Sequence, residues 1–220
     1  MGSNSKQEVE IKLRVTDIST LRRRLKQLLA RKVYPRTYEY NTLYDTAKKG
    51  LARHGQLIRI RIERPASESG RNAHLRSNEA ILTYKGPSSA GSSRHTIDNR
   101  RKKGRYKVRE EVEVAISDGE QMRRILGALG LRPLFRYEKF RTTYALPRIR
   151  NLKIELDETP IGTFLELEGS PSAIDRGAGL LGYSRAEYIT RTYGALYVAD
   201  SRRRGRKPSD MLFRATKKLH

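Results

Sequence analysis

Hydrophobic and polar residues alternate along eight segments of the chain, which is the period of a β-strand with one apolar face. These segments are residues 7–15, 37–45, 56–63, 79–85, 105–115, 138–145, 152–157 and 162–168. A sheet built from them buries its apolar face and leaves the opposite face to polar side chains. The pattern therefore predicts a fold in which β-structure dominates.

Apolar residues recur with the helical period in four further segments, residues 17–31, 118–129, 172–181 and 185–197. Ser117 and Glu120 have the spacing of a capping box at the start of the second helix, and Gly130 follows its end. Its stripe predicts burial of Met122, Ile125, Leu126 and Leu129. Helices of this kind cover a sheet with their apolar sides. Strands and helices together predict an α+β fold.

The polar face of the strands is unusual because it consists largely of ionised side chains in register. In residues 7–15, for example, Glu8, Glu10 and Lys12 share one face. The simplest interpretation is a face exposed to water. Several stripes, however, lack the Ser, Thr, Asn and Gln of ordinary solvated faces. The apolar sides of the helices must also cover the apolar face of the sheet. A sheet with helices outside can close on itself with the charged face inward.

Enclosing so many charges demands partners, because an idealised ion loses about 20 kcal/mol on entering a low-dielectric interior. We therefore expect a wet lumen whose charges are paired and completed by metal cations and an anionic ligand. Neighbouring acids can share a hard cation through their oxygens. Arg and Lys suit phosphate oxygens. The combination predicts a site for a metal-chelated polyphosphate.

Composition supports an anionic partner and excludes several other chemistries. The 220 residues include 47 Lys+Arg and 24 Asp+Glu, a formal net charge of +23. With no Cys, disulfides, thiolate zinc sites and cysteine nucleophiles are excluded. No apolar run approaches the roughly 20 residues of a membrane helix, so we expect a cytoplasmic protein without membrane contact. The sequence has no Walker glycine loop, and His54, His74, His95 and His220 show no metal-ligand spacing.

The chain divides into a flexible start at residues 1–6, one domain at 7–200 and a basic tail at 201–220. The tail holds eight Lys/Arg against one acid, Asp210, and its charge predicts disorder. Residues 65–78 and 86–104 are expected to form loops. The tail is a candidate contact for polyanions or nucleic acid. The oligomeric state, including a homodimer, is left open.

Eight motifs in order make the chain resemble the CYTH superfamily, also called triphosphate tunnel metalloenzymes. They are Glu8-Val9-Glu10-Ile11-Lys12, NTLYDT (41–46), LIRIRIE (57–63), LTYKGP (82–87), VREEVEV (108–114), FRYEKFRTTY (135–144), LDETPIGTFLELEG (156–169) and YITRTYGALY (188–197). The resemblance covers residues 7–197. It implies an eight-stranded antiparallel β-barrel tunnel with flanking helices, which holds Mg²⁺ or Mn²⁺ and a triphosphate.

The resemblance also implies roles for the ionised residues. Metal carboxylates are expected at Glu8, Glu10, Glu166 and Glu168, and a second ion at Asp157 with Glu111 or Glu113; plain ion pairing is the alternative for all of them. Phosphate contacts are expected at Arg59, Arg61, Lys85, Arg109, Lys139 and Arg141. Lys12 is expected to orient a carboxylate or the nucleophile, and a general base is the second option. Arg191 stands where some relatives place a phosphate-binding Lys.

Three functions remain open at this stage. The first is hydrolysis of tripolyphosphate, thiamine triphosphate or a nucleoside triphosphate. The second is the class IV adenylyl cyclase reaction, which converts ATP to cyclic AMP and pyrophosphate. The third is a non-enzymatic module that binds polyphosphate or RNA.

Overall fold

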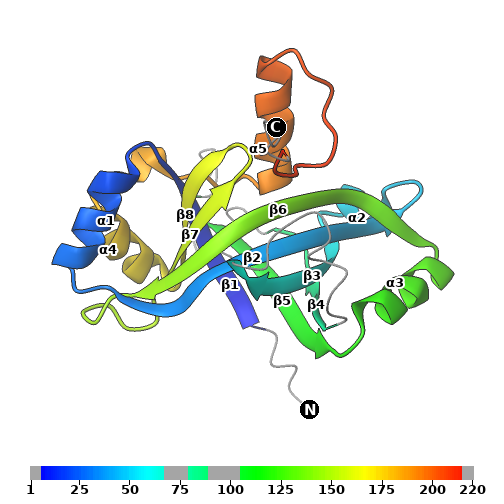
Figure 1. Ribbon diagram of the computed structural model, residues 1–220, viewed down its shortest axis with the longest axis horizontal. Coiled ribbons are helices and arrows are strands. Elements are labelled where there is room, and N and C mark those ends of the chain that lie inside the picture. The colour runs from blue at the N-terminus through cyan, green and yellow to red at the C-terminus, as the bar shows by residue number, and fades with distance from the viewer. Residues whose placement is uncertain (1–5, 67–78, 89–104, 215–220) are drawn as a thin grey trace, which may run out of the picture.

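Eight antiparallel strands close into a barrel in the computed structural model, which describes residues 6–66, 79–88 and 105–214 (Figure 1). The strands are β1 (Lys6–Val15), β2 (Arg31–Thr46), β3 (Leu57–Pro65), β4 (Ala80–Lys85), β5 (Lys107–Ile116), β6 (Leu131–Ala145), β7 (Lys153–Thr159) and β8 (Gly162–Glu168). Their order around the barrel is β1-β5-β4-β3-β2-β6-β7-β8. The predicted closed barrel is confirmed.

The helices lie outside the strands, as predicted, although their limits differ from the sequence pattern. They are α1 (Ile18–Gln27), α2 (Gly50–Arg53), α3 (Gly119–Ala128), α4 (Pro171–Leu180) and α5 (Tyr193–Arg203), with a 3₁₀ turn at Arg185–Glu187. In Figure 1, α1 and α4 lie together at one side of the barrel and α3 at the opposite side. The helix predicted over 17–31 ends early, since Leu29 has a positive φ of 54° and Arg31 begins β2.

The helix predicted over 118–129 differs in its cap and in its burial. Asp118 caps α3, accepting from the backbone N–H groups of Glu120 and Gln121, both at 2.9 Å, so the predicted Ser117 cap is wrong. Only Leu126 of the expected stripe is fully buried, whereas Ile125 and Leu129 are exposed. A short helix at one end of a barrel has fewer strands to pack against than a helix across its side.

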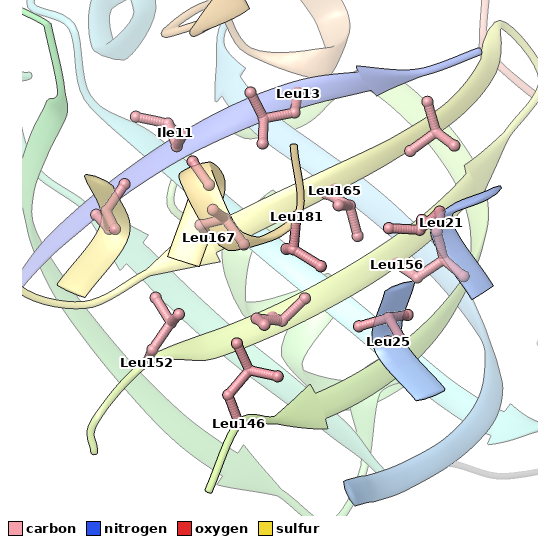
Figure 2. Packing of buried hydrophobic residues seen from close by; sticks show 14 of the residues in the cluster. Ile11, Leu13, Leu21, Leu25, Leu146, Leu152, Leu156, Leu165, Leu167 and Leu181 are labelled. Carbon is pink, nitrogen blue, oxygen red and sulfur yellow. The ribbon is translucent and has the colours of Figure 1, made fainter. Parts of the chain in front are cut away.

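The main apolar core lies between the barrel wall and helices α1 and α4 (Figure 2). Alternation along β1 sends Ile11 and Leu13 outward into this core. Leu165 and Leu167 of β8 do the same, and all four side chains have zero exposure. Burying such a side chain contributes about 1.5–3 kcal/mol. The apolar face of the sheet is thus satisfied outside, which turns the charged face inward.

The C-terminal segment differs from the disordered tail that its charge predicts. Helix α5 continues to Arg203, and the chain then returns to pair with the edge of β6 at Tyr137. Met211 donates its N–H to the Arg136 carbonyl at 2.9 Å, and its carbonyl accepts from the N–H of Glu138 at 3.0 Å. Its side chain is 1% exposed. The prediction of disorder is therefore wrong for residues 201–214, because the apolar Met211 outweighs the like-charge repulsion.

Other expectations fall outside the described residues. These are most of the predicted loops at 65–78 and 86–104, residues 215–220 of the tail, and residues 1–5 of the start. Within the part of the chain that the structure describes, no helix combines the length and apolar character that spanning a membrane requires.

Candidate functional site

The charged faces of the strands line a cavity of about 370 Å³ inside the barrel. Nine Lys or Arg side chains and seven Glu side chains contribute to its wall, an excess of two positive charges. Of the residues predicted for the site, those on the wall are Glu8, Glu10, Lys12, Arg59, Arg61, Lys85, Arg109, Glu111, Glu113, Lys139, Arg141, Glu166 and Glu168. The inward orientation of the charged stripes is a direct result of strand alternation.

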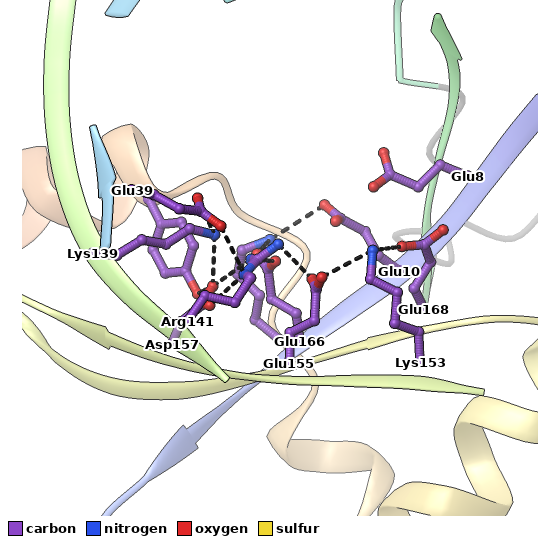
Figure 3. A network of polar contacts seen from close by, with 12 residues as sticks. Glu8, Glu10, Glu39, Lys139, Arg141, Lys153, Glu155, Asp157, Glu166 and Glu168 are labelled. Carbon is purple, nitrogen blue, oxygen red and sulfur yellow. Dashed lines mark hydrogen bonds and ion pairs between the residues drawn. The ribbon is translucent and has the colours of Figure 1, made fainter. Parts of the chain in front are cut away.

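Asp157 is the exception, because it lies beneath the cavity wall with zero exposure. It accepts from Lys139 at 3.0 Å, from the hydroxyl of Tyr193 at 2.7 Å, and from Arg141 at 2.7 and 2.6 Å in a bidentate pair. Arg141 also contacts Glu155 at 2.6 Å and Glu166 (Figure 3). Burial disfavours the guanidinium, but these carboxylates outweigh it and raise the pKa of Arg141. Arg141 and Asp157 are thus locked together as a structural pair.

The predicted second ion site at Asp157 with Glu111 or Glu113 is not formed. Glu111 contacts Lys85 at 3.1 Å, and Glu113 contacts Arg59 at 3.1 Å, in a network separate from that of Asp157. Among the described residues, no three acidic or His side chains are gathered tightly enough to hold a metal by themselves. The expectation failed because strand alternation predicts on which face of the sheet a side chain lies, but not how deeply the side chain is buried there.

Lys12 lies between two of the predicted metal carboxylates. Its Nζ is 2.8 Å from Glu166 Oε1 and 3.2 Å from Glu10 Oε1. Burial disfavours the ammonium, yet the two carboxylates outweigh it and raise the pKa of Lys12 above its ordinary value. A protonated Lys12 cannot accept a proton, so the geometry favours its orienting role over that of a general base.

Lys107 is a second ammonium on Glu10, and the sequence analysis gave it no role. Burial, with the nearby charge of Lys12, lowers the pKa of Lys107 to about 8 against the opposing effect of Glu10. Glu10 therefore has two cationic partners, and together they hold its pKa well below the ordinary value despite burial. The carboxylate is fully ionised at neutral pH.

Strands β3, β4 and β5 carry a cationic wall, defined as Arg59, Arg61, Lys85 and Arg109. Arg59 and Arg61 both converge on Glu113, at 3.1 and 3.4 Å. Lys85 joins Glu8 at 2.7 Å to Glu111 at 3.1 Å. Burial raises the pKa of Glu111 to about 7, with Glu8 adding to the effect and Lys85 opposing it. Arg59, Arg61 and Lys85 thus contact glutamate carboxylates, and an incoming anion can take the place of these carboxylates.

Several residues of the lumen were missed because their sequence surroundings suggested packing. Glu39, in a tyrosine-rich strand, is 2% exposed and lies 3.4 Å from Lys139. Lys153 and Glu155 face inward on β7. Their alternation with Asp157 was visible, but nothing in the sequence distinguished their roles. Arg191 is exposed and donates to the Ala195 carbonyl at 2.7 Å, so it does not reach the cavity wall.

The acidic side chains on β1 and β8 are of the chemical type that a hard divalent cation requires, and such a cation would have to draw them together. Glu10 is directly opposite Glu168 in the ladder between these strands, and both side chains face the cavity with Glu8 two residues away. Like charges opposite each other on neighbouring strands are destabilising unless a cation lies between them. Carboxylate oxygens are the ligands that Mg²⁺ and Mn²⁺ prefer. In this structure Lys12 and Lys107 contact Glu10, and Lys153 contacts Glu168.

Comparison with known proteins agrees with this geometry, since residues 6–193 match the CYTH domain. The chain belongs to the CYTH domain family. Enzymes of this family are triphosphatases or class IV adenylyl cyclases and in general depend on a metal. A Methanocaldococcus jannaschii protein, provisionally named an adenylate cyclase, is 28% identical over 169 residues, covering 76% of this chain and 79% of the relative.

Solved structures share the fold at lower identity. A Vibrio parahaemolyticus protein with the same provisional name has a TM-score of 0.64 at 20% identity, covering 88% of this chain and 98% of its own. A Pyrococcus horikoshii protein has a TM-score of 0.62 at 24% identity, covering 88% and 99%. A Hippeastrum protein, provisionally an adenylyl cyclase and described with a dominant triphosphatase activity, has a TM-score of 0.56 at 20% identity, covering 91% and 97%.

Proposed function

We propose that this CYTH protein is a divalent-metal-dependent hydrolase of triphosphates. The observation that carries the proposal is the lumen itself, in which the cationic wall on β3–β5 and the carboxylates on β1 and β8 line one cavity. A triphosphate with its cation needs both kinds of group at once. The Hippeastrum protein, which shares the fold, is described with triphosphatase activity despite its cyclase name, and we extend that activity to this chain.

The cationic wall is suited to hold the phosphate chain. Arg59, Arg61 and Lys85 each contact a glutamate in the free protein. A phosphate oxygen is an equivalent anionic partner, and Arg can bind it through two parallel N–H donors. The same groups stabilise the negative charge that develops on the transferred phosphoryl oxygens. Lys139 and Arg141 supply further positive charge at the opposite side of the cavity.

Glu10 and Glu168, with Glu8, are the residues that we expect to hold Mg²⁺ or Mn²⁺. A bound cation supplies charge neutralisation at the phosphate oxygens and lowers the pKa of a bound water. Lys12 keeps Glu10 and Glu166 ionised and oriented through its two contacts. The barrel wall limits the access of bulk water, which strengthens each of these electrostatic interactions.

The cyclase reaction is the second candidate because the Methanocaldococcus relative bears that name. Product analysis separates the two. We incubate the protein with ATP, tripolyphosphate or thiamine triphosphate, with Mg²⁺ or Mn²⁺, and separate the products by chromatography. Orthophosphate without cyclic AMP is the expected result. Cyclic AMP with pyrophosphate from ATP would replace the hydrolase proposal by the cyclase.

A double variant, Glu8→Gln with Glu10→Gln, tests the assignment of the carboxylates. We expect loss of metal-dependent turnover by at least about 100-fold, since removing a charge that acts in the transition state costs that much in comparable sites. Circular dichroism should show an intact barrel. Glu158→Gln is the matched control, because Glu158 pairs with Arg36 on the outer surface. Unchanged turnover in the double variant would refute the assignment.

A further inference from the structure

Asn41 of β2 is a buried polar side chain without the hydrogen bonds that burial normally requires. It has zero exposure. Within the described part of the chain, neither its Oδ1 nor its Nδ2 has a hydrogen-bond partner. Leaving a buried donor or acceptor unsatisfied costs about 1–3 kcal/mol. Such a group in a native structure calls for a functional reason or an ordered water.

The register of the barrel directs Asn41 toward the lumen. It lies opposite Arg61 of β3 on one side and Tyr137 of β6 on the other, and both of these line the cavity. Leu43, two residues along the same strand, also lines the cavity. Alternation therefore places the amide of Asn41 on the inner face of β2.

One contact in the lumen passes over the strand that carries Asn41. Arg59 of β3 donates to the hydroxyl of Tyr137 on β6 at 3.3 Å, and β2 lies between these two strands. Because Arg59 is opposite Leu43 and Tyr137 is opposite Asn41, the contact crosses the inner face of β2 between these two positions. Arg59 is held there by Glu113 at 3.1 Å and Thr83 at 3.1 Å, while its Nε makes no hydrogen bond to a described residue.

An anion that draws Arg59 away from Glu113 also breaks its contact with Tyr137. The Oδ1 and Nδ2 atoms of Asn41 then lie beside the new anion, and the Nε–H of Arg59 is still an unused donor. An Asn amide can donate through Nδ2 to a phosphate oxygen and accept through Oδ1 from a guanidinium. The polar atoms that are unsatisfied in the free protein match those that a phosphate and a displaced arginine present.

We propose that Asn41 is a substrate-binding residue, whose amide hydrogen-bonds a phosphoryl oxygen of the triphosphate and the Nε–H of Arg59. This inference rests on the proposed function, because it takes the ligand to be a phosphate chain. Leaving the Asn41 amide unsatisfied lowers the stability of the free protein but keeps the amide available for binding the ligand.

The test is Asn41→Leu, which keeps the branched shape of the side chain and removes both polar atoms. Without ligand, the thermal midpoint should stay unchanged or rise by about 2–4 °C, since an unsatisfied polar pair is replaced by apolar atoms. Affinity for tripolyphosphate, measured by calorimetry with EDTA and again with Mg²⁺, should fall roughly ten- to a hundredfold, as for a lost hydrogen bond to a charged group. Asn41→Asp, which places a carboxylate beside the anion, should bind more weakly still.

Thr159→Val is the matched control for the stability readout. Thr159 is buried, but its hydroxyl donates to the Gly162 carbonyl at 2.7 Å, so its polar atom is satisfied. This variant should lose stability and keep its affinity for tripolyphosphate. A midpoint of Asn41→Leu that falls like that of Thr159→Val would overturn the inference, because it would show that the amide is already satisfied. Unchanged affinity would overturn it as well.

The outcomes for this inference and for the proposed function are distinguishable. If the wild-type protein binds tripolyphosphate but hydrolyses neither it nor ATP nor thiamine triphosphate, the proposed function fails, while the effect of Asn41→Leu on binding still decides this inference. If the wild-type protein hydrolyses tripolyphosphate and Asn41→Leu matches it in affinity, only this inference fails. A wild-type protein that binds tripolyphosphate in neither condition refutes both.

Discussion

Single side chains in the lumen differ in charge state because burial and neighbouring charges act against each other. Glu10 has two ammonium partners, and its pKa is lowered. Glu111 lies 3.1 Å from Lys85, which also contacts Glu8, and 4.0 Å from Arg59, and its pKa is raised to about 7. Burial therefore outweighs the cationic partners at Glu111, whereas the two ammonium groups outweigh burial at Glu10.

Glu111→Gln should stabilise the protein at pH 8 and leave its stability nearly unchanged at pH 5. Because the pKa of Glu111 is higher in the folded protein than its ordinary value of 4.5, the folded state binds more protons between those values. Stability from this group is present below about pH 4.5 and is lost as pH rises through about 7. Thermal midpoints in EDTA at the two pH values measure the effect. Exposed Glu110→Gln is the control, and an equal shift at both pH values would contradict the assignment.

Strand alternation predicted the face of nearly every site residue, because a period of two leaves only two choices. It predicted thirteen of the residues on the cavity wall. It did not predict that Asp157 lies below the wall, since depth depends on how long the neighbouring side chains are. Asn41 was missed because its importance lies in hydrogen bonds that it does not make, and a sequence does not show these.

The helices and strands differ from their predicted limits where segments distant in the sequence pack together. Strands β2 and β6 begin at residues 31 and 131, earlier than the pattern at 37 and 138 predicted. They pair with each other along their full lengths, with register shifts between Lys32 and Thr37. Pairing satisfies the backbone even where side chains are exposed and show no alternation. Backbone pairing of Met211 with β6 orders the C-terminal segment in the same way.

Removal of residues 208–220 should destabilise the barrel, whereas removal of residues 215–220 should not. The first truncation removes Met211 and the hydrogen bonds that it makes to β6. Met211→Ala alone should cost about 2–5 kcal/mol, as for other buried Met side chains. Urea unfolding of the two truncated proteins and of Met211→Ala checks this. Equal stability of both truncated proteins would show that the segment contributes nothing.

For the whole molecule, charge is divided between an enclosed lumen and the outer surface. The lumen wall has an excess of only two positive charges, while the formal net charge is +23. Most of the positive excess therefore lies outside the site. Exposed basic residues at the end of helix α5 and just beyond it include Arg202, Arg206 and Lys207. The outer surface is where we expect polyanions to bind, separately from catalysis.

Binding of single-stranded RNA should be sensitive to salt and independent of turnover. A protein with 6–10 phosphate contacts loses about 10³–10⁵ in affinity between 50 and 200 mM salt. Replacing Arg202, Arg206 and Lys207 by Gln should weaken RNA retention on a filter and leave tripolyphosphate hydrolysis unchanged. Glu8→Gln with Glu10→Gln should do the reverse. Joint loss of both properties in either variant would show that RNA and triphosphate share one site.

The barrel closes through β1, which is hydrogen-bonded to β8 on one side and β5 on the other. Glu10 and its cross-strand neighbour Glu168 are 158 residues apart in the chain, so the two carboxylates meet only when β8 joins β1. Pairings of such large sequence separation form late. Pairing with β5 alone leaves the acidic strand without its second neighbour, and the complete group of carboxylates therefore comes together in one step as the seam between β1 and β8 closes.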